Sequence, residues 1–304
     1  MRKAFIQELV AQARIHPDIF LIVGDLGFSV IEPFVEEFPE RFLNAGIAEQ
    51  NMAGVAAGLA YEGYRVFIYS IANFPTLRCF EQIRNDICYH SLPVTIVSVG
   101  GGLSYGSQGY SHYGLEDLAV MRVLPGLTVI APGDPVETRL ALRDILRQRG
   151  PCYLRLGKTQ ELKVYENEPE FQIGKALILS EGSDITLIST GGVLEKTVKA
   201  AQELKRKNIS ATVLSMHTLS PLDKESLLKW ALATGRVMTI EEHGAGGLAA
   251  VVSEVLAMAG KPLKFVCLYL RQNEIDVSGS QEYLCRRQGI SDENIVQTAL
   301  TMCK

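Results

Sequence analysis

One short stretch, residues 44–52 (NAGIAEQNM), constrains this chain most, because it places a single acid in apolar company. Glu49 lies among glycine, alanine, isoleucine and methionine, and the small residues at 53–60 predict a closely packed helix directly after it. Removing a carboxylate from water costs free energy unless something binds it. We therefore expect Glu49 to face a binding partner.

The composition is that of an ordinary globular protein. The chain has 304 residues, of which 47% are hydrophobic and 21% charged, and its net charge is -4. That length is enough for two domains, and the charge gives no indication of nucleic acid or an anionic membrane as a partner. No apolar run is long enough to cross a bilayer. Six scattered cysteines without a CxxC pair favour reduced thiols in the cytoplasm over zinc or disulfide frameworks.

Predicted strands and helices alternate along residues 1–158, up to a last strand at 152–156. Such alternation is typical of an α/β fold, with a parallel sheet covered by helices on both faces. Residues 159–172 are charged and poor in apolar side chains, and we predict a linker there. A second alternation over residues 173–304 predicts a smaller α/β domain.

Several distinctive residues are predicted at the carboxyl ends of strands in the first domain. Open parallel sheets bind their ligands at that edge. Each member of the set follows a predicted strand: Ser29, Glu49, Phe74, the glycine-rich loop 100–114, and Lys158. We expect one pocket to lie over this edge.

The order of motifs along the chain resembles the transketolase family. The segment GIAEQNM at 46–52 is similar to a motif in the pyrimidine-binding domain of transketolases and of 1-deoxyxylulose-5-phosphate synthases. Further similar segments follow in the family's order, namely NFPT at 73–76, RCFEQIR at 78–84, SH at 111–112, VIAPGD at 129–134 and GPCYLR at 150–155. The segment EEH at 241–243, followed by GGL at 246–248, resembles the family's C-terminal domain. The resemblance implies a pyrimidine-binding domain followed by a transketolase C-terminal domain.

The resemblance assigns one group of residues to the cofactor, thiamine diphosphate. It implies that Glu49 faces N1′ of the aminopyrimidine, where a protonated carboxyl promotes the imino tautomer that takes the proton from the thiazolium C2. Phe74 corresponds to the aromatic residue that stacks on the aminopyrimidine, and Ile71 and Leu77 would complete the apolar slot. The alternatives are an acid stabilised at a helix N-terminus and an aromatic residue packed in the core.

The resemblance assigns a second group to the substrate. It implies that His112, on the glycine-rich loop, contacts substrate oxygens and shuttles protons. Lys158 lies where relatives often carry an arginine for the terminal anion, and a lysine meets phosphate or sulfonate as a point charge. Ser29 corresponds to a serine that also holds phosphate. The alternatives are a solvated loop histidine, a solvated lysine at a domain boundary and a turn serine.

Two residues of the expected substrate pocket depart from the family pattern. Gly100 stands where many transketolases have a phosphate-binding histidine, and Gln108 stands where many have an aspartate that contacts a substrate hydroxyl. Both positions would still line the substrate site. The cofactor is therefore predicted more firmly than the sugar, and a sulfonated or branched sugar is compatible with the sequence.

The chain lacks the Gly-Asp-Gly motif with which thiamine diphosphate enzymes hold the diphosphate and Mg²⁺. The nearest matches, at residues 24–26 and 133–135, do not supply the second glycine. Without carboxylate and amide oxygen ligands no Mg²⁺ site can be built, so we predict no metal site in this chain. We interpret it as the C-terminal subunit of a split transketolase. A separate N-terminal subunit would hold the diphosphate and Mg²⁺ in an α2β2 assembly.

The predicted activity is the transfer of a two-carbon ketol unit from a ketose to an aldehyde, which requires the partner subunit. Two alternatives stay within thiamine enzymes: a carboligase similar to 1-deoxyxylulose-5-phosphate synthase, and the β-subunit of a 2-oxoacid dehydrogenase. A third is a regulatory homologue without activity. The presence of Glu49, Phe74 and His112 disfavours this last alternative.

Overall fold

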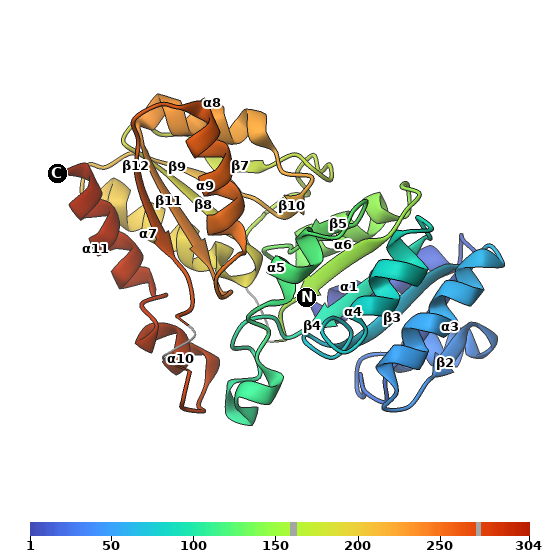
Figure 1. The fold of residues 1–304 in the computed structure, drawn as a ribbon. Helices are drawn as coiled ribbons and strands as arrows, with labels where there is room; N and C mark the ends of the chain where they lie inside the picture. The colour runs from blue at the N-terminus through green and yellow to red at the C-terminus, as the bar shows by residue number, and fades with distance from the viewer. Residues whose placement is uncertain (159–162, 272–274) are drawn as a thin grey trace.

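The computed structural model describes residues 1–158, 163–271 and 275–304, which form two α/β units side by side (Figure 1). The strands of the first sheet are β1 (Ile19–Val23), β2 (Phe42–Asn44), β3 (Arg65–Ile71), β4 (Val94–Val99), β5 (Thr128–Ile130), β6 (Cys152–Leu156) and β10 (Thr218–Ser220). Their order across the sheet is β10-β5-β6-β4-β3-β1-β2. Strand β10 pairs with β5 antiparallel, and the other pairs are parallel.

Helices cover both faces of this sheet (Figure 1). On one face lie α1 (Arg2–Ala13), α2 (Glu32–Glu37) and α6 (Pro135–Ile145). On the other lie α3 (Glu49–Tyr61), α4 (Phe80–Gln82), a π-helix (Ile83–Cys88) and α5 (Asp117–Arg122). Successive strand residues point to opposite faces, so Leu21 and Val23 join one apolar cluster and Ile22 joins the other. The predicted parallel sheet with both faces covered is confirmed.

The second sheet has the order β12-β11-β8-β9-β7. Its strands are β7 (Leu177–Ser180), β8 (Ile185–Thr190), β9 (Ala211–Ser215), β11 (Arg236–Glu241) and β12 (Lys264–Leu268). Its helices are α7 (Leu194–Arg206), α8 (Lys224–Thr234), α9 (Leu248–Ala259), α10 (Gln281–Arg287) and α11 (Asp292–Cys303). Strand β7 pairs with β9 antiparallel, and the other pairs are parallel. The predicted smaller α/β unit is confirmed.

Three details differ from the sequence-based expectation. Strand β10 follows β9 in the chain but joins the first sheet, although it comes from the region predicted as the second domain. Strand β7 and helix α10 were not predicted. The spacing of apolar residues over 77–89 predicts one α-helix, whereas the structure has a short α-helical turn at Phe80–Gln82 that continues as a π-helix, Ile83–Cys88. π-Helices accommodate an extra residue in a turn, which a search for the ordinary helical period does not detect.

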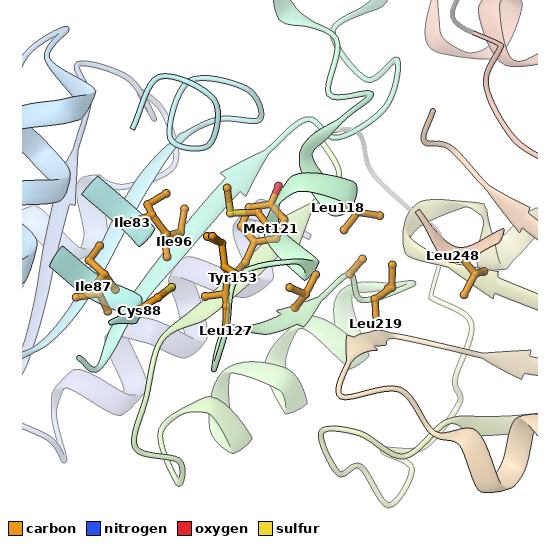
Figure 2. Close-up of a cluster of buried hydrophobic side chains, with 14 of the residues drawn as sticks. Ile83, Ile87, Cys88, Ile96, Leu118, Met121, Leu127, Tyr153, Leu219 and Leu248 are labelled. Atoms are coloured by element: carbon orange, nitrogen blue, oxygen red, sulfur yellow. The ribbon is translucent and has the colours of Figure 1, made fainter. Parts of the chain in front are cut away.

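The apolar core is continuous between the two units. In Figure 2 the cluster extends from Ile83 and Ile96 of the first unit, past Leu219 of β10, to Leu248 of the second unit. The buried His243 adds a polar contact, because its Nε2 accepts a hydrogen bond from the Leu118 N–H at 3.1 Å. Burial lowers the pKa of His243 to about 4, so this ring is neutral at physiological pH. Extensive packing therefore fixes how the two units meet.

The predicted linker, 159–172, begins with residues 159–162, which lie outside the described residues. Its next part is attached to helix α6. The Val164 N–H donates to the Asp134 carboxylate at 2.9 Å, and the Tyr165 hydroxyl donates to Glu137 at 2.6 Å. Burial raises the pKa of Glu137 to about 7, against the opposing effect of the Tyr165 hydrogen bond. This part of the segment is thus packed against the first unit.

No described helix combines the length and the apolar character that a membrane crossing requires. The six cysteines all lie in described parts of the chain, and all are free thiols.

Candidate active site

Glu49 is the first residue of α3 and its side chain is only 4% exposed. The Arg78 Nη1 donates to both of its carboxylate oxygens, at 3.2 and 3.1 Å. The Arg78 side chain, in contrast, is 48% exposed. A Cβ on Gly24, at the end of β1, would lie 3.7 Å from the Glu49 Cγ, so this strand ends directly against the acid. A buried carboxylate is thus held by a cation that reaches it from the solvent side.

An open pocket of about 530 Å³ lies beside this carboxylate, lined by Ile47, Ala48, Glu49, Gln50, Asn51 and Arg78. It therefore forms where the chain passes from β2 into α3. The exposed fraction of Ile47 is 77%, which leaves an apolar side chain open at the pocket's rim.

Phe74 lies on the turn that follows β3, close to Glu49 through their shared neighbour Arg78. The Arg78 guanidinium carbon is 4.0 Å from the centroid of the Phe74 ring, which is cation–π geometry. The centroid of the His112 ring lies 5.4 Å from the centroid of the Phe74 ring, and the two ring planes make an angle of 67°. Phe74 is only half-buried. Arg78 therefore links Glu49 to Phe74, and the Phe74 ring in turn contacts His112.

His112 ends a 3-10 turn, Tyr110–His112, on the glycine-rich loop. Its Nδ1 is 2.9 Å from the Ser111 Oγ, and the Asn73 amide donates to the Ser111 carbonyl at 2.9 Å. On its other side lies Tyr105, whose ring centroid is 6.1 Å from that of His112. The imidazole is thus placed between two aromatic rings from different segments.

Two cationic residues, Lys158 and Arg2, lie near Tyr105. The Lys158 Nζ lies 4.0 Å from the centroid of the Tyr105 ring, and the Arg2 Nε donates to the Lys158 carbonyl at 3.2 Å. Burial lowers the pKa of Lys158, and the positive charge of Arg2 lowers it further. Two neighbouring positive charges favour an anion between or beside them. Neither Arg2 nor Tyr105 was singled out from the sequence.

The absence of a side chain at Gly100 has a steric cause. This residue has φ +81°, in the left-handed region, and a Cβ here would overlap the ring of Tyr105. The Tyr105 ring therefore takes the space where a side chain at residue 100 would lie. A residue that replaces Gly100 would have to displace this tyrosine.

The remaining predicted residues lie at the margin of this group. Ser29 is exposed, with φ 65°, and its N–H donates to the Glu32 carboxylate at 2.6 Å in the turn before α2. Gln108 is exposed at the end of the turn Gly106–Gln108. Ile71 is half-buried at the end of β3, and Leu77 is 45% exposed. Ser29 thus bonds within its own turn and not to the residues around Tyr105.

Within residues 1–158, 163–271 and 275–304, no three or more histidine, cysteine, aspartate or glutamate side chains converge in a way that could hold a metal ion.

Comparison with known proteins shows the family to which this chain belongs. Residues 1–162 match the family model for the pyrimidine binding domain of transketolase, and residues 174–295 match that for the transketolase C-terminal domain. The chain therefore belongs to the transketolase family, as the order of its motifs indicated.

Individual relatives are similar over almost their whole length. The chain is 37% identical to an apulose-4-phosphate transketolase subunit of Phocaeicola vulgatus, over 100% of this chain and 97% of the relative. It is 34% identical to a 6-deoxy-6-sulfo-D-fructose transketolase subunit of Clostridium sp. (strain MSTE9), over 98% and 93% respectively. A solved structure described as a split gene transketolase, inactive beta4 tetramer, has a TM-score of 0.90 and 37% identity, and the match covers 100% of this chain and 99% of that one.

Proposed function

We propose that the chain is the C-terminal subunit of a thiamine-diphosphate-dependent transketolase, which moves a two-carbon ketol unit from a ketose to an aldehyde. The observation that carries this proposal is the chain of contacts at one edge of a parallel sheet, in which Arg78 joins Glu49 to Phe74 and Phe74 contacts His112. The end-to-end similarity to transketolase subunits supports it.

The residues present fit one half of the cofactor. A buried carboxylate beside an open pocket, with a half-buried phenyl ring nearby, suits an aminopyrimidine that needs an acid at its ring nitrogen and an aromatic face. In this proposal Glu49 would hold a proton at N1′, Phe74 would orient the ring, and Ile71 and Leu77 would shield its edges. When bound, the cofactor supplies a thiazolium ring that accepts the electron pair of the broken C–C bond. His112 would hold or move protons at substrate oxygens.

The other half of the cofactor requires a partner in this proposal. An N-terminal subunit would hold the diphosphate and Mg²⁺, in an α2β2 assembly within the cytoplasm. Supporting this, the similar proteins are named as subunits, and the chain lacks a Gly-Asp-Gly motif. The similar solved structure is described as an inactive β4 tetramer, which supports self-association of this subunit.

The substrate in this proposal carries a terminal anion, a phosphate or a sulfonate. Lys158 and Arg2 provide two positive charges near Tyr105, and the His112 ring is a neighbour of the same tyrosine. One similar protein is named for a phosphorylated sugar and another for a sulfonated one, so both anions are considered. Ser29, Gly100 and Gln108 would complete the surroundings of the sugar.

Cofactor binding in this geometry requires Arg78 to move. Its guanidinium lies over the Phe74 ring and bonds both Glu49 oxygens, the two groups that the aminopyrimidine would contact. Because the side chain is 48% exposed, it can turn toward solvent. In the chain alone, Arg78 compensates the charge of Glu49.

The first prediction tests the proposed function itself. In the complex reconstituted with the N-terminal subunit, Glu49→Ala is expected to lower kcat by about 100-fold or more, because proton transfer by a positioned group contributes at least that much. Glu62→Ala, at the exposed end of the same helix, is the control and is expected to leave kcat unchanged. Full activity of the Glu49 variant would refute the catalytic proposal. Turnover of pyruvate instead of a ketose would favour the two alternative thiamine enzymes.

The second prediction concerns the chain without its partner. Calorimetry with thiamine diphosphate and Mg²⁺ is expected to show weak binding to this chain alone and tight binding to the complex, because the anionic end finds its ligands on the partner. Tight binding by the isolated chain that is abolished by removal of Mg²⁺ would contradict the split site.

The third prediction concerns the substrate anion. Lys158→Met is expected to raise KM for a phosphorylated or sulfonated ketose by about tenfold, the loss expected for a hydrogen bond to a charged group. The apparent KM for the cofactor should not change. The control is Lys163→Met, an exposed lysine whose Nζ bonds the Glu166 carbonyl. An unchanged ketose KM in the Lys158 variant would show that the anion binds elsewhere.

The fourth prediction concerns Arg78. If its side chain must leave for the cofactor to bind, Arg78→Ala should lower the Kd of the complex for thiamine diphosphate, measured by quenching of protein fluorescence. Arg84→Ala, an exposed arginine bonded to Asn85, is the control. A higher Kd in the Arg78 variant would show instead that this arginine contacts the bound cofactor.

A further inference from the structure

The second α/β unit holds the glycine-rich loop through one buried carboxylate. Glu242, directly after β11, is buried, and it accepts a hydrogen bond from the Leu103 N–H at 2.7 Å. The Gln281 amide, on α10, donates to both Glu242 oxygens at 3.0 and 2.9 Å and to the Ser104 Oγ at 3.3 Å. Two segments of the second unit therefore meet on residues 103 and 104 of the loop.

Further contacts fix the loop at positions on either side. The Gly279 N–H donates to the Gly106 carbonyl at 3.1 Å, and the Tyr113 hydroxyl lies 3.0 Å from the Val277 carbonyl. The returning end of the loop is bound to its start, because Gly102 and Gly114 exchange backbone hydrogen bonds. The loop is thus attached to the second unit near both of its ends.

The packing leaves no room for a side chain at Gly102 or Gly106. A Cβ on Gly102 would approach the Glu242 Cγ and carbonyl oxygen to 2.6 Å, and one on Gly106 would overlap the Gly279 carbonyl oxygen. Gly102 also has φ +66°. Glycines at these two positions are explained by close contact with the second unit, independently of any ligand.

We infer that Glu242 and Gln281 are positioning residues for the substrate side of the site. Tyr105 and His112 lie between the two attached parts of the loop, and the contacts of Glu242 and Gln281 described above are to residues 103 and 104. Because residues 103 and 104 are held by Glu242 and Gln281, the position of the next residue, Tyr105, is fixed as well. The centroid of the Tyr105 ring lies 6.1 Å from that of His112, so the position of Tyr105 affects that of His112. The effect on catalysis rests on the proposed role of His112, whereas the effect on the loop does not.

The hydrogen bonds between Gln281 and Glu242 can be tested by exchanging the donor and acceptor side chains between the two positions. Gln281→Glu places a second carboxylate against Glu242, so the two repel and the Leu103 attachment weakens. The double variant E242Q/Q281E restores a donor facing an acceptor: the new amide donates to the new carboxylate, and its oxygen still accepts from Leu103. The control is Glu282→Gln, since Glu282 is an exposed neighbour on α10.

Hydrogen exchange measured by mass spectrometry on the reconstituted complex is the readout that is independent of activity. Amides of residues 103–113 are expected to exchange about tenfold faster in Gln281→Glu, in line with the loss of a hydrogen bond to a charged group, and to recover in the double variant. Unchanged exchange in the single variant, or no recovery in the double variant, would overturn the inference.

Steady-state kinetics on the same variants separate positioning from a merely structural role. Gln281→Glu is expected to raise KM for the ketose and leave the apparent KM for the cofactor unchanged, because Glu49 and Phe74 lie outside the loop; E242Q/Q281E should restore the ketose KM. A faster-exchanging loop with normal ketose kinetics, or equal changes in both KM values, would refute the positioning role. If the unmodified complex acts on no ketose, the proposed function fails, while the exchange result still decides whether the pair holds the loop.

Discussion

The buried ion pair between Arg155 and Asp117 is the interaction on which the rest of the structure depends. Their side chains are 6% and 1% exposed, and the Arg155 Nε lies 2.7 Å from the Asp117 Oδ2. The same guanidinium donates to the carbonyls of Gly114 and Glu242, at 2.9 and 3.0 Å. A buried charge that loses its partner costs about 3–5 kcal/mol, so these groups must remain assembled. Strand β6, helix α5, the glycine-rich loop and the second unit are therefore joined at one point.

The candidate site has two parts that are held in place by different elements of the structure. Glu49, Phe74 and Arg78 are carried by the first sheet and α3, without a contribution from the second unit. His112 and Tyr105 stand on a loop attached to both units, and Lys158 follows the strand that carries Arg155. The proposed cofactor residues are thus placed by one domain and the proposed substrate residues by two. In that proposal, substrate preference would change through the loop and its attachment while the cofactor residues stay in place.

Much of the fold could be predicted because hydrophobic periodicity is a local property. Apolar runs such as residues 152–156 predicted the strands of a parallel sheet, and the resemblance of residues 46–52 to a family motif gave the proposed cofactor side. Strand β10 could not be recognised, since a three-residue strand has no period and its partner is distant in the chain. Arg2 and Tyr105 were missed for a related reason. Their contacts with Lys158 join residues far apart in sequence, and no local pattern encodes side-chain direction.

The Glu49–Arg78 pair shows how half of a binding site can be stable on its own. In the proposed function Glu49 faces an aminopyrimidine, and without that ring its carboxylate needs another partner, because an uncompensated buried charge is costly. Arg78 removes this cost from the solvent side, where the pair itself contributes only about 0–1 kcal/mol because one partner is exposed. Stacking of a ring on Phe74 contributes about 0.5–1.5 kcal/mol beyond the apolar area that it buries. In the proposed cofactor complex, the ring would replace Arg78 at both groups that the arginine contacts, the Glu49 carboxylate and the Phe74 ring.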